Sequence, residues 1–299
     1  MPVHLPAHNR RQFLATVGAG LVASASPAFG KTVDGTLVYL LNDTHIGERH
    51  PPASQIPTNL KTVVTELVEL KRKPAAVLIN GDLALYDGQP GDYRHFARIV
   101  EPLRAAKVDL HLTLGNHDNR EAFYEVLQEE RKNDPPVESR HISVVSTPHA
   151  NFFLLDSLTQ TLLTPGTLGT TQRNWLADAL DAHADRPAII VAHHNPRLGG
   201  DPKHFPGGLV DSVELWQLLA KRRHVKAYVH GHVHDRAYAT HAGIHILNMP
   251  AISYVADPEL STTGWTVARL RPDGMTLTTR TTDPLHPWNG EQRTLAWRD

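Results

Sequence analysis

Short apolar runs alternate along the chain with longer segments in which apolar residues recur every three or four positions. The short runs predict buried β-strands, and the periodic segments predict amphipathic helices. Strands are expected at residues 36–41, 75–79, 108–114, 142–145, 152–155, 188–192, 225–229, 237–240, 244–248, 265–270 and 275–280. Helices are expected at residues 58–70, 92–103, 119–130, 170–180 and 211–223, and the last residues are expected to form an irregular tail. The alternation of strands with helices indicates an α/β fold.

Five of the predicted strands end in a cluster of Asp, Asn or His. These clusters are Asn42-Asp43-Thr44-His45, Asn80-Gly81-Asp82, Gly115-Asn116-His117-Asp118, His193-His194-Asn195-Pro196 and His230-Gly231-His232-Val233-His234. In α/β sheets, ligands bind in the crevice outside the carboxyl ends of the strands. We therefore expect the five clusters to converge on one crevice if their strands lie in adjoining sheets.

Composition narrows the chemistry that these clusters can support. The 299 residues include 20 histidines and no cysteine, so disulfides are excluded and any metal must be bound by nitrogen and oxygen. Residues 1–30 hold only Arg10 and Arg11 as charged residues, which leaves 28 basic and 31 acidic residues and a formal charge of −3. This balance lacks the basic face of a nucleic-acid binder, so no nucleic-acid polymer is expected as a partner.

The N-terminus has the features of an export signal. Arg10 and Arg11 precede Phe13-Leu14, and a mildly apolar stretch at residues 15–25 leads to small residues that end at Gly30. This pattern resembles a twin-arginine (Tat) signal peptide, with Ala23-Ser24-Ala25 as an allowed cleavage site. We therefore expect the Tat translocase as a partner during export, a periplasmic or secreted protein, and a single domain over residues 31–299. An uncleaved anchor or a chance pair of arginines is the alternative.

The strand-end clusters supply oxygen and nitrogen donors suited to transition metals. The candidate ligands are Asp43, His45, Asp82, Asn116, His193, His232 and His234. The two oxygens of the Asp82 carboxylate could bridge two ions, and a donor set with open coordination suits Zn, Mn or Fe rather than a structural zinc. Each cluster alone could be an ordinary turn or a buried, satisfied histidine. Their joint occurrence at five strand ends favours a metal centre.

Taken together and in order, the clusters carry a family resemblance. Asp43-x-His45, Gly81-Asp82, Gly115-Asn116-His117-Asp118, His193 and Gly231-His232-x-His234 resemble the five-block signature of the calcineurin-like metallophosphoesterases. Asp43-Thr44-His45-Ile46 and the His-His-x-Pro block look most like the class III cyclic-nucleotide and glycerophosphodiester phosphodiesterases. The likeness spans roughly residues 36–250.

The resemblance implies a four-layer αββα sandwich of two mixed sheets with a dinuclear metal centre at its edge. It implies that Asp43, His45 and His234 bind one ion, that Asn116, His193 and His232 bind the other, and that Asp82 bridges them. It further implies that a metal-bound hydroxide attacks the phosphorus of a phosphodiester. In this scheme His117 assists the leaving group and Asp118 orients the ring of His117.

Two departures and several alternatives remain open. The family block is usually His-His-Pro-Pro, whereas this chain has Asn195 before Pro196, which leaves open whether His193 or His194 is the ligand. Asn42 stands where Ser is common. The substrate could also be a phosphomonoester or nucleotide, and the fold could be an inactive metal-binding module. We expect residues 48–57, residues 198–208 and the turn near Tyr254 to flank the pocket, and the metal pair, natural substrate and oligomeric state stay open.

Overall fold

The computed structural model describes residues 31–198 and 207–299. The signal peptide predicted for residues 1–30 lies outside the described residues. Residues 33–299 form the second of two units into which the chain divides, and this second unit is compact and carries the helices and strands given below. Within the described ranges, every helix is too short or too polar to cross a bilayer.

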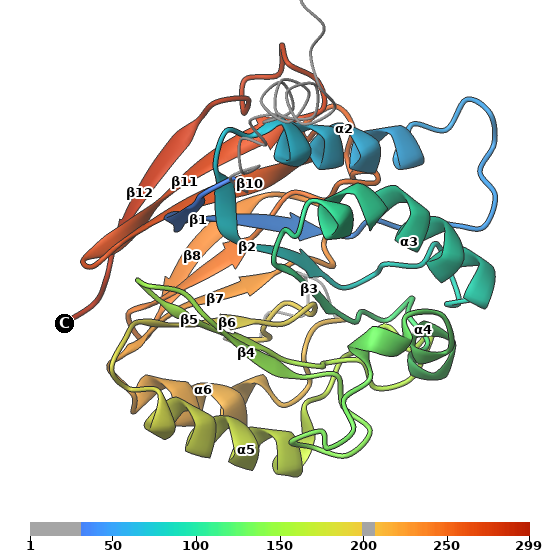
Figure 1. The fold of residues 1–299 in the computed structure, drawn as a ribbon. Coiled ribbons are helices and arrows are strands. Elements are labelled where there is room, and N and C mark those ends of the chain that lie inside the picture. Colours follow the sequence, from blue (N-terminus) through green and yellow to red (C-terminus); the bar gives the residue numbers. More distant parts are fainter. Residues whose placement is uncertain (1–30, 199–206) are drawn as a thin grey trace, which may run out of the picture. The chain divides into compact units, whose positions relative to one another are not determined.

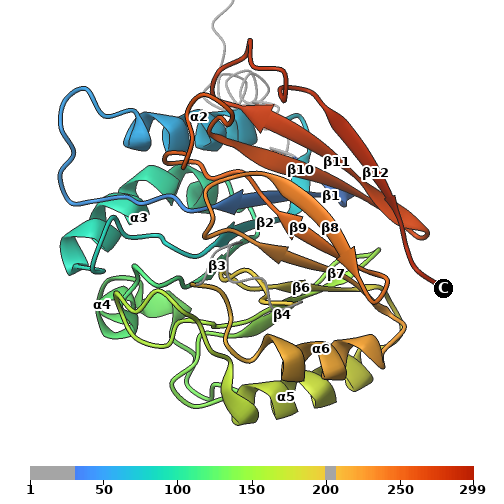
Figure 2. The same cartoon turned by 180° about the vertical axis from the view of Figure 1, so that it is seen from behind.

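The second unit contains two six-stranded mixed sheets (Figures 1 and 2). The first sheet has the order β12-β11-β10-β1-β2-β3, with β1 (Val33–Asn42), β2 (Lys73–Asn80), β3 (Leu110–Thr113), β10 (Gly264–Arg271), β11 (Gly274–Thr281) and β12 (Gln292–Ala296). The second sheet has the order β4-β5-β6-β7-β9-β8, with β4 (Ser143–Ser146), β5 (Asn151–Leu154), β6 (Ala188–Val191), β7 (Val225–His230), β8 (Ala237–His241) and β9 (Ile244–Asn248).

Helices cover the outer face of each sheet, as Figure 1 shows. On the first sheet these are α2 (Ile56–Glu69), α3 (Pro90–Ala105) and α4 (Arg120–Val126), the last followed by the 3-10 turn η1 (Gln128–Glu130). On the second sheet they are α5 (Gly169–Ala182) and α6 (Ser212–Ala220). The single helix predicted at residues 119–130 is therefore divided, because Leu127 leaves the helical conformation between α4 and η1.

Alternation along the central strands explains the layers. In β1, Tyr39 and Leu41 pack with Leu60 of α2, whereas Val38 and Leu40 pack between the two sheets. Successive side chains of a strand point to opposite faces, so a strand that is apolar at every position must be covered on both faces. A third core cluster fills the space between the second sheet and its helices. The predicted four-layer αββα sandwich is confirmed.

The C-terminus differs from the prediction of an irregular tail. Residues Gln292–Ala296 form β12, which pairs antiparallel with β11 at the edge of the first sheet. Leu295 is the buried residue of this strand, and the others are exposed. The tail prediction was wrong because an edge strand held by backbone hydrogen bonds needs little apolar patterning.

Strand register brings the predicted clusters together. Asn42 at the end of β1 pairs with Asn80 at the end of β2, which in turn pairs with Thr113 at the end of β3. The Asn80 side chain crosses to the second sheet, where its Nδ2 donates to the carbonyl oxygen of Ala192 at 3.1 Å. Both sheets thus present the carboxyl ends of their parallel strands at one edge of the sandwich.

Candidate metal centre

The backbone bearing the predicted ligands turns sharply as each strand ends. Five of the seven candidates have positive φ angles: Asp43 (53°), His45 (45°), Asp82 (46°), His232 (70°) and His234 (55°). This left-handed conformation costs a non-glycine residue on the order of 1 kcal/mol, and it persists only where the surrounding structure enforces it. These turns lie in three loops, those after β1, β2 and β7, and they aim the side chains of the five residues at one point.

One group of donors gathers around His45. It consists of Asp43, His45, Asp82 and His234, whose donor atoms lie within 4.8 Å of one another. Nε2 of His45 lies 3.1 Å from Nε2 of His234 and 3.5 Å from Oδ2 of Asp82. Nε2 of His234 lies 3.5 Å from Oδ1 of Asp43. All four residues are buried, so these polar atoms face one another rather than solvent.

Backbone carbonyls fix which nitrogen of each ring faces this group. Nδ1 of His45 lies 3.1 Å from the carbonyl oxygen of Leu85, and Nδ1 of His234 lies 2.8 Å from that of Tyr254. A carbonyl oxygen only accepts, so each Nδ1 donates a hydrogen and each Nε2 presents a lone pair. Two lone pairs 3.1 Å apart repel unless a cation lies between them. Nitrogens about 2.1 Å from a common ion would be about 3.0–3.4 Å apart, so the spacing fits a shared ion.

A second group gathers around His193. Nε2 of His193 lies 3.2 Å from Oδ2 of Asp82 and 3.3 Å from Oδ1 of Asn116. Its Nδ1 lies 3.3 Å from the carbonyl oxygen of Asn80, which again directs the other nitrogen toward the centre. Oδ2 of Asp82 therefore lies near a histidine of each group, as a bridging carboxylate oxygen would.

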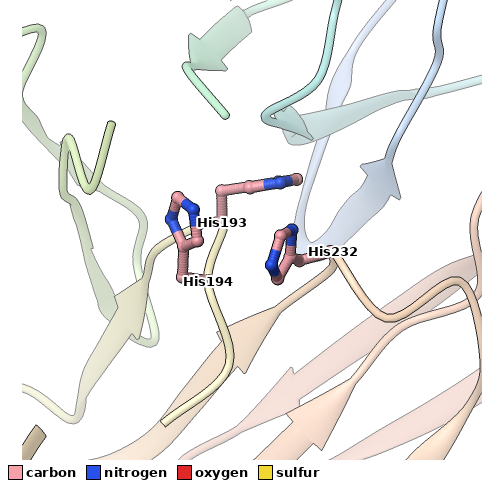
Figure 3. Close-up of side chains that lie close together, drawn as sticks. All are labelled: His193, His194 and His232. Atoms are coloured by element: carbon pink, nitrogen blue, oxygen red, sulfur yellow. The ribbon is translucent and has the colours of Figure 1, made fainter. Parts of the chain in front are cut away.

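His232 and His194 lie beside His193, and Figure 3 shows the three rings close together. Nε2 of His232 lies 3.1 Å from the carbonyl oxygen of Gly207, which places the lone pair on Nδ1. His194 directs its Nδ1 to the hydroxyl of Ser157 at 2.7 Å. Nε2 of His193 faces Asp82 and Asn116, whereas Nδ1 of His194 bonds to Ser157. Both rings belong to the group of three histidines that could hold an ion.

The electrostatics of the centre suit cations. Burial lowers the pKa of His45 and that of His232 to about 3, so both rings are neutral near pH 7. Burial alone would lower the pKa of His193, but the charge of Asp82 and its hydrogen bond outweigh burial and raise that pKa to about 9. The same contact, against the effect of burial, lowers the pKa of Asp82 well below its usual value. In the absence of metal, the proton on His193 therefore balances part of the negative charge that a metal cation would otherwise balance.

His117 and Asp118 both lie at the candidate metal centre. Contrary to the prediction, the Asp118 carboxylate does not contact the His117 ring. Nδ1 of His117 lies 2.6 Å from the carbonyl oxygen of Tyr86. The Asp118 carboxylate instead accepts the N–H groups of Leu83, Ala84 and Gly115 and the hydroxyl of Tyr93. The expectation that Asp118 orients the His117 ring is therefore wrong, because the buried carboxylate is used to hold the loops after β2 and β3.

Two motif glycines allow the ligand loops to approach each other. A Cβ atom at Gly231 would collide with the carboxylate of Asp43, and one at Gly115 would collide with that of Asp82. Asp43 also accepts the backbone N–H of His232 at 3.1 Å from both of its oxygens. The glycines therefore make room for the carboxylate ligands themselves.

Comparison with known proteins agrees with this arrangement. The sequence profile described as calcineurin-like phosphoesterase matches residues 36–236, more than half of the chain. The chain belongs to the calcineurin-like phosphoesterase family. This family is dinuclear and metal-dependent. The two groups of possible ligands, one around His45 and one around His193, fit two ions, and Asp82 lies close to both histidines.

Relatives of this phosphoesterase carry the names of cyclic nucleotide phosphodiesterases. It is 30% identical over 229 residues to the "Probable cyclic nucleotide phosphodiesterase" of Rhodococcus erythropolis, covering 73% of this chain and 71% of the relative. It is 29% identical over 250 residues to the 3',5'-cyclic adenosine monophosphate phosphodiesterase CpdA of Escherichia coli, covering 80% and 86%. A cAMP/cGMP dual specificity phosphodiesterase of Mycobacterium tuberculosis is 28% identical over 225 residues, covering 73% and 67%.

Solved structures share the fold at lower identity. A dimetal phosphatase from Danio rerio superposes with a TM-score of 0.66 at 17% identity, covering 88% of this chain and 99% of that one. GAP50 of Plasmodium superposes with a TM-score of 0.59 at 14% identity, covering 88% and 89%. Together with the family profile, these likenesses confirm the calcineurin-like fold of this phosphoesterase.

A pocket opens beside the donor groups of the phosphoesterase. Its volume is about 250 Å³, and it is lined by Asp82, Asn116, His117, Thr164, His232, Val233, His234, Tyr254 and Ala256. The predicted turn near Tyr254 does line it, whereas the predicted segment at residues 198–208 lies largely outside the described residues.

Sequence reasoning missed the groups that orient the imidazoles. These are the backbone carbonyls of Asn80, Leu85, Tyr86, Gly207 and Tyr254. Backbone carbonyls occur all along the chain, so no pattern of side chains in the sequence distinguishes the five carbonyls that orient the imidazoles. The positive φ angles of the candidate ligands could not be predicted either, because Asp and His do not require that conformation.

Proposed function

We propose that this phosphoesterase is an exported phosphodiesterase with two metal ions, and that its substrates are cyclic nucleotides. The observation that carries the proposal is the position of Asp82 Oδ2, which lies 3.5 Å from Nε2 of His45 and 3.2 Å from Nε2 of His193. One carboxylate shared by two sets of imidazoles suits two adjacent ions. The names of the relatives support the substrate class.

Each ion would have its own set of residues. Asp43, His45 and His234 would hold one, Asn116, His193 and His232 the other, and Asp82 would hold both. When bound, two such ions supply Lewis acidity toward phosphoryl oxygens and a nucleophile at neutral pH. The carbonyls behind the histidines keep the ring nitrogens aimed, as outer-shell partners of metal ligands do.

His117 is the residue that we propose to move a proton. It lines the pocket with Asp82 and Asn116, and its ring centroid lies 5.1 Å from that of His45. Because the carbonyl of Tyr86 occupies Nδ1, the Nε2 atom is the one that can hold a proton for the leaving oxygen. General acid assistance of this kind contributes about 10²- to 10⁴-fold in rate.

The reaction can be tested with protein reconstituted separately with Mn, Zn and Fe. We expect hydrolysis of 3',5'-cyclic AMP and of bis(p-nitrophenyl) phosphate, with p-nitrophenyl phosphate a poorer substrate. Two bound ions per chain, measured by elemental analysis, should accompany full activity. A strong preference for the monoester at full metal loading would refute the diesterase proposal.

Export rests on the pair Arg10 and Arg11 ahead of Phe13-Leu14. We propose that the Tat translocase carries the protein to the periplasm or beyond. Replacement of both arginines by lysine should retain the protein in the cytoplasm while leaving the activity of the purified domain unchanged. Unaltered export of the Lys-Lys variant would refute this route.

A further inference from the structure

The pocket beside the metal centre has a polar side and an apolar side. The candidate ligands and His117 form the polar side, and Val233, Tyr254 and Ala256 form the apolar side. Thr164 adds a hydroxyl, and the described lining contains no Lys or Arg. Discrimination between phosphodiesters must therefore come largely from the part of the substrate that meets the apolar side.

Tyr254 is fixed against the metal ligands. Its ring centroid lies 4.2 Å from that of His234, at an interplanar angle of 33°, and 5.1 Å from that of His45. Its carbonyl oxygen accepts the Nδ1–H of His234 at 2.8 Å. Backbone and ring are thus both anchored, yet 45% of the side chain stays exposed. A rigid, partly open aromatic ring next to the reacting centre is a platform on which a flat group can stack.

Further apolar side chains stand near this platform. Tyr86 is 62% exposed, and its ring centroid lies 5.9 Å from that of His117. Leu162 and Leu163 are each 45% exposed on the loop that leads to Thr164. The N–H of Leu162 donates to the carbonyl oxygen of Asn116 at 2.7 Å, and Leu162 adopts the left-handed conformation with φ of 67°. The loop is therefore tied to the metal centre in a conformation that leucine adopts only at a cost.

The concentration of these residues is unusual for a surface. Among the described residues, Tyr86, Leu162, Leu163 and Tyr254 account for four of nine exposed large hydrophobic side chains. Apolar side chains scattered singly need no explanation, but a group beside a pocket marks a binding site. A polar alcohol such as glycerol would find few hydrogen-bond partners here, whereas a nucleobase or aryl ring would lose little on leaving water.

We infer that Tyr254, with Tyr86 and the Leu162–Leu163 loop around it, forms a subsite for a nucleobase or aryl group carried by the substrate and so determines substrate specificity. The inference rests on the proposed phosphodiesterase activity and assigns the residues that select within it. Tyr254 is the central residue because it alone among these four lines the pocket. The subsite favours diesters that carry a nucleobase or aryl group over those that carry glycerol.

The test compares two diesters on one enzyme. The kcat and KM are measured for 3',5'-cyclic AMP and for glycerophosphoethanolamine with metal-loaded wild type, Tyr254→Phe and Tyr254→Leu. Base–aromatic stacking of the usual strength predicts that Tyr254→Leu raises KM for the nucleotide about 5- to 100-fold. KM for glycerophosphoethanolamine should change less than twofold, and Tyr254→Phe should retain the selectivity of the wild type.

Controls separate stacking from damage to the metal site. Leu285→Ala removes a side chain that is 90% exposed elsewhere and should change neither substrate's KM. Metal content of each variant and calorimetric binding of AMP against glycerol 3-phosphate give readouts independent of turnover. Equal losses for both diesters, or an equal loss in Tyr254→Phe, would overturn the subsite. If the wild type hydrolyses neither diester, the proposed function fails instead, and selective binding of AMP still decides whether the subsite exists.

Discussion

The first sheet consists of two halves that share a core but end differently. In the parallel half, β1, β2 and β3 each run into a buried cluster of Asp, Asn or His. In the antiparallel half, β10, β11 and β12 are joined in simple antiparallel pairs. Leu270 and Leu277 of that half pack in the same intersheet cluster as Leu40 of β1.

The two halves of the first sheet therefore have different roles: the parallel half carries candidate ligands, and the antiparallel half extends the core. Parallel strands all end at one edge, so their loops can bring donors together from distant parts of the chain. Antiparallel partners end at opposite edges, and here they extend the core without contributing a candidate ligand. Substitutions in the two halves should therefore affect different properties.

The largest effect is expected for Asp82→Asn in the parallel half. Loss of the shared carboxylate should lower turnover about 10³-fold or more, because outer-shell partners of metals alone are worth about 10- to 100-fold. Metal content, measured by elemental analysis, should fall as well. Asp273→Asn in the antiparallel half is the matched control, since Asp273 is 83% exposed and should tolerate the change. Wild-type turnover by metal-replete Asp82→Asn would contradict the two-metal account.

His117→Ala should lower turnover about 10²- to 10⁴-fold while leaving metal content nearly intact. The residue lines the pocket but belongs to neither donor group. Steady-state kinetics with a diester whose leaving group needs no proton, such as bis(p-nitrophenyl) phosphate, should show a smaller loss than with cyclic AMP. Equal losses with both diesters would argue against a proton-transfer role.

Leu277→Ala probes the antiparallel half. Leu277 is 1% exposed between the sheets, and truncation of such a leucine costs about 2–5 kcal/mol of unfolding free energy. Urea unfolding should show this loss, whereas KM and metal content of the folded variant should remain those of the wild type. A loss of metal at temperatures where the variant is folded would show that the two halves are not separable.

A smaller effect concerns the pH dependence of metal loading. Asp82 raises the pKa of His193 to about 9 in the absence of metal, so the ring is protonated at pH 7. A metal must displace that proton, and affinity should therefore rise between pH 7 and pH 9, by up to about tenfold per unit, and level off above. Calorimetry in buffers of different ionisation enthalpy should detect the released proton. A pH-independent affinity over this range would contradict the assignment of His193.

Much of the fold could be predicted from the sequence because its central strands are strongly patterned. The run at residues 36–41 is apolar at nearly every position, which is typical of a strand that is covered on both faces. The edge strand β12 was missed because Leu295 is the one buried residue in it. The four-layer arrangement was supplied by the family resemblance. The order of strands within the two sheets was not predicted, because it depends on long-range pairing.

The candidate donor side chains of the site could also be predicted from the sequence. The groups that orient these side chains could not. Side-chain chemistry identifies Asp82 and His193, and strand ends identify where they meet. The partner of His117 could not be identified, because the carbonyl of Tyr86 carries no signal in the sequence. Asp118 was misassigned for a related reason: a carboxylate next to a histidine in the chain need not face it in space.

The left-handed backbone at Asp43, His45, Asp82, His232 and His234 has a consequence for how the protein can change. Glycine would adopt each of these conformations at lower cost than the ligand that stands there. The contacts of the buried ligands therefore hold each of these residues in a conformation that costs on the order of 1 kcal/mol. A residue better suited to the backbone at any of the five positions would remove a metal donor, so relief of this strain and retention of activity exclude each other there.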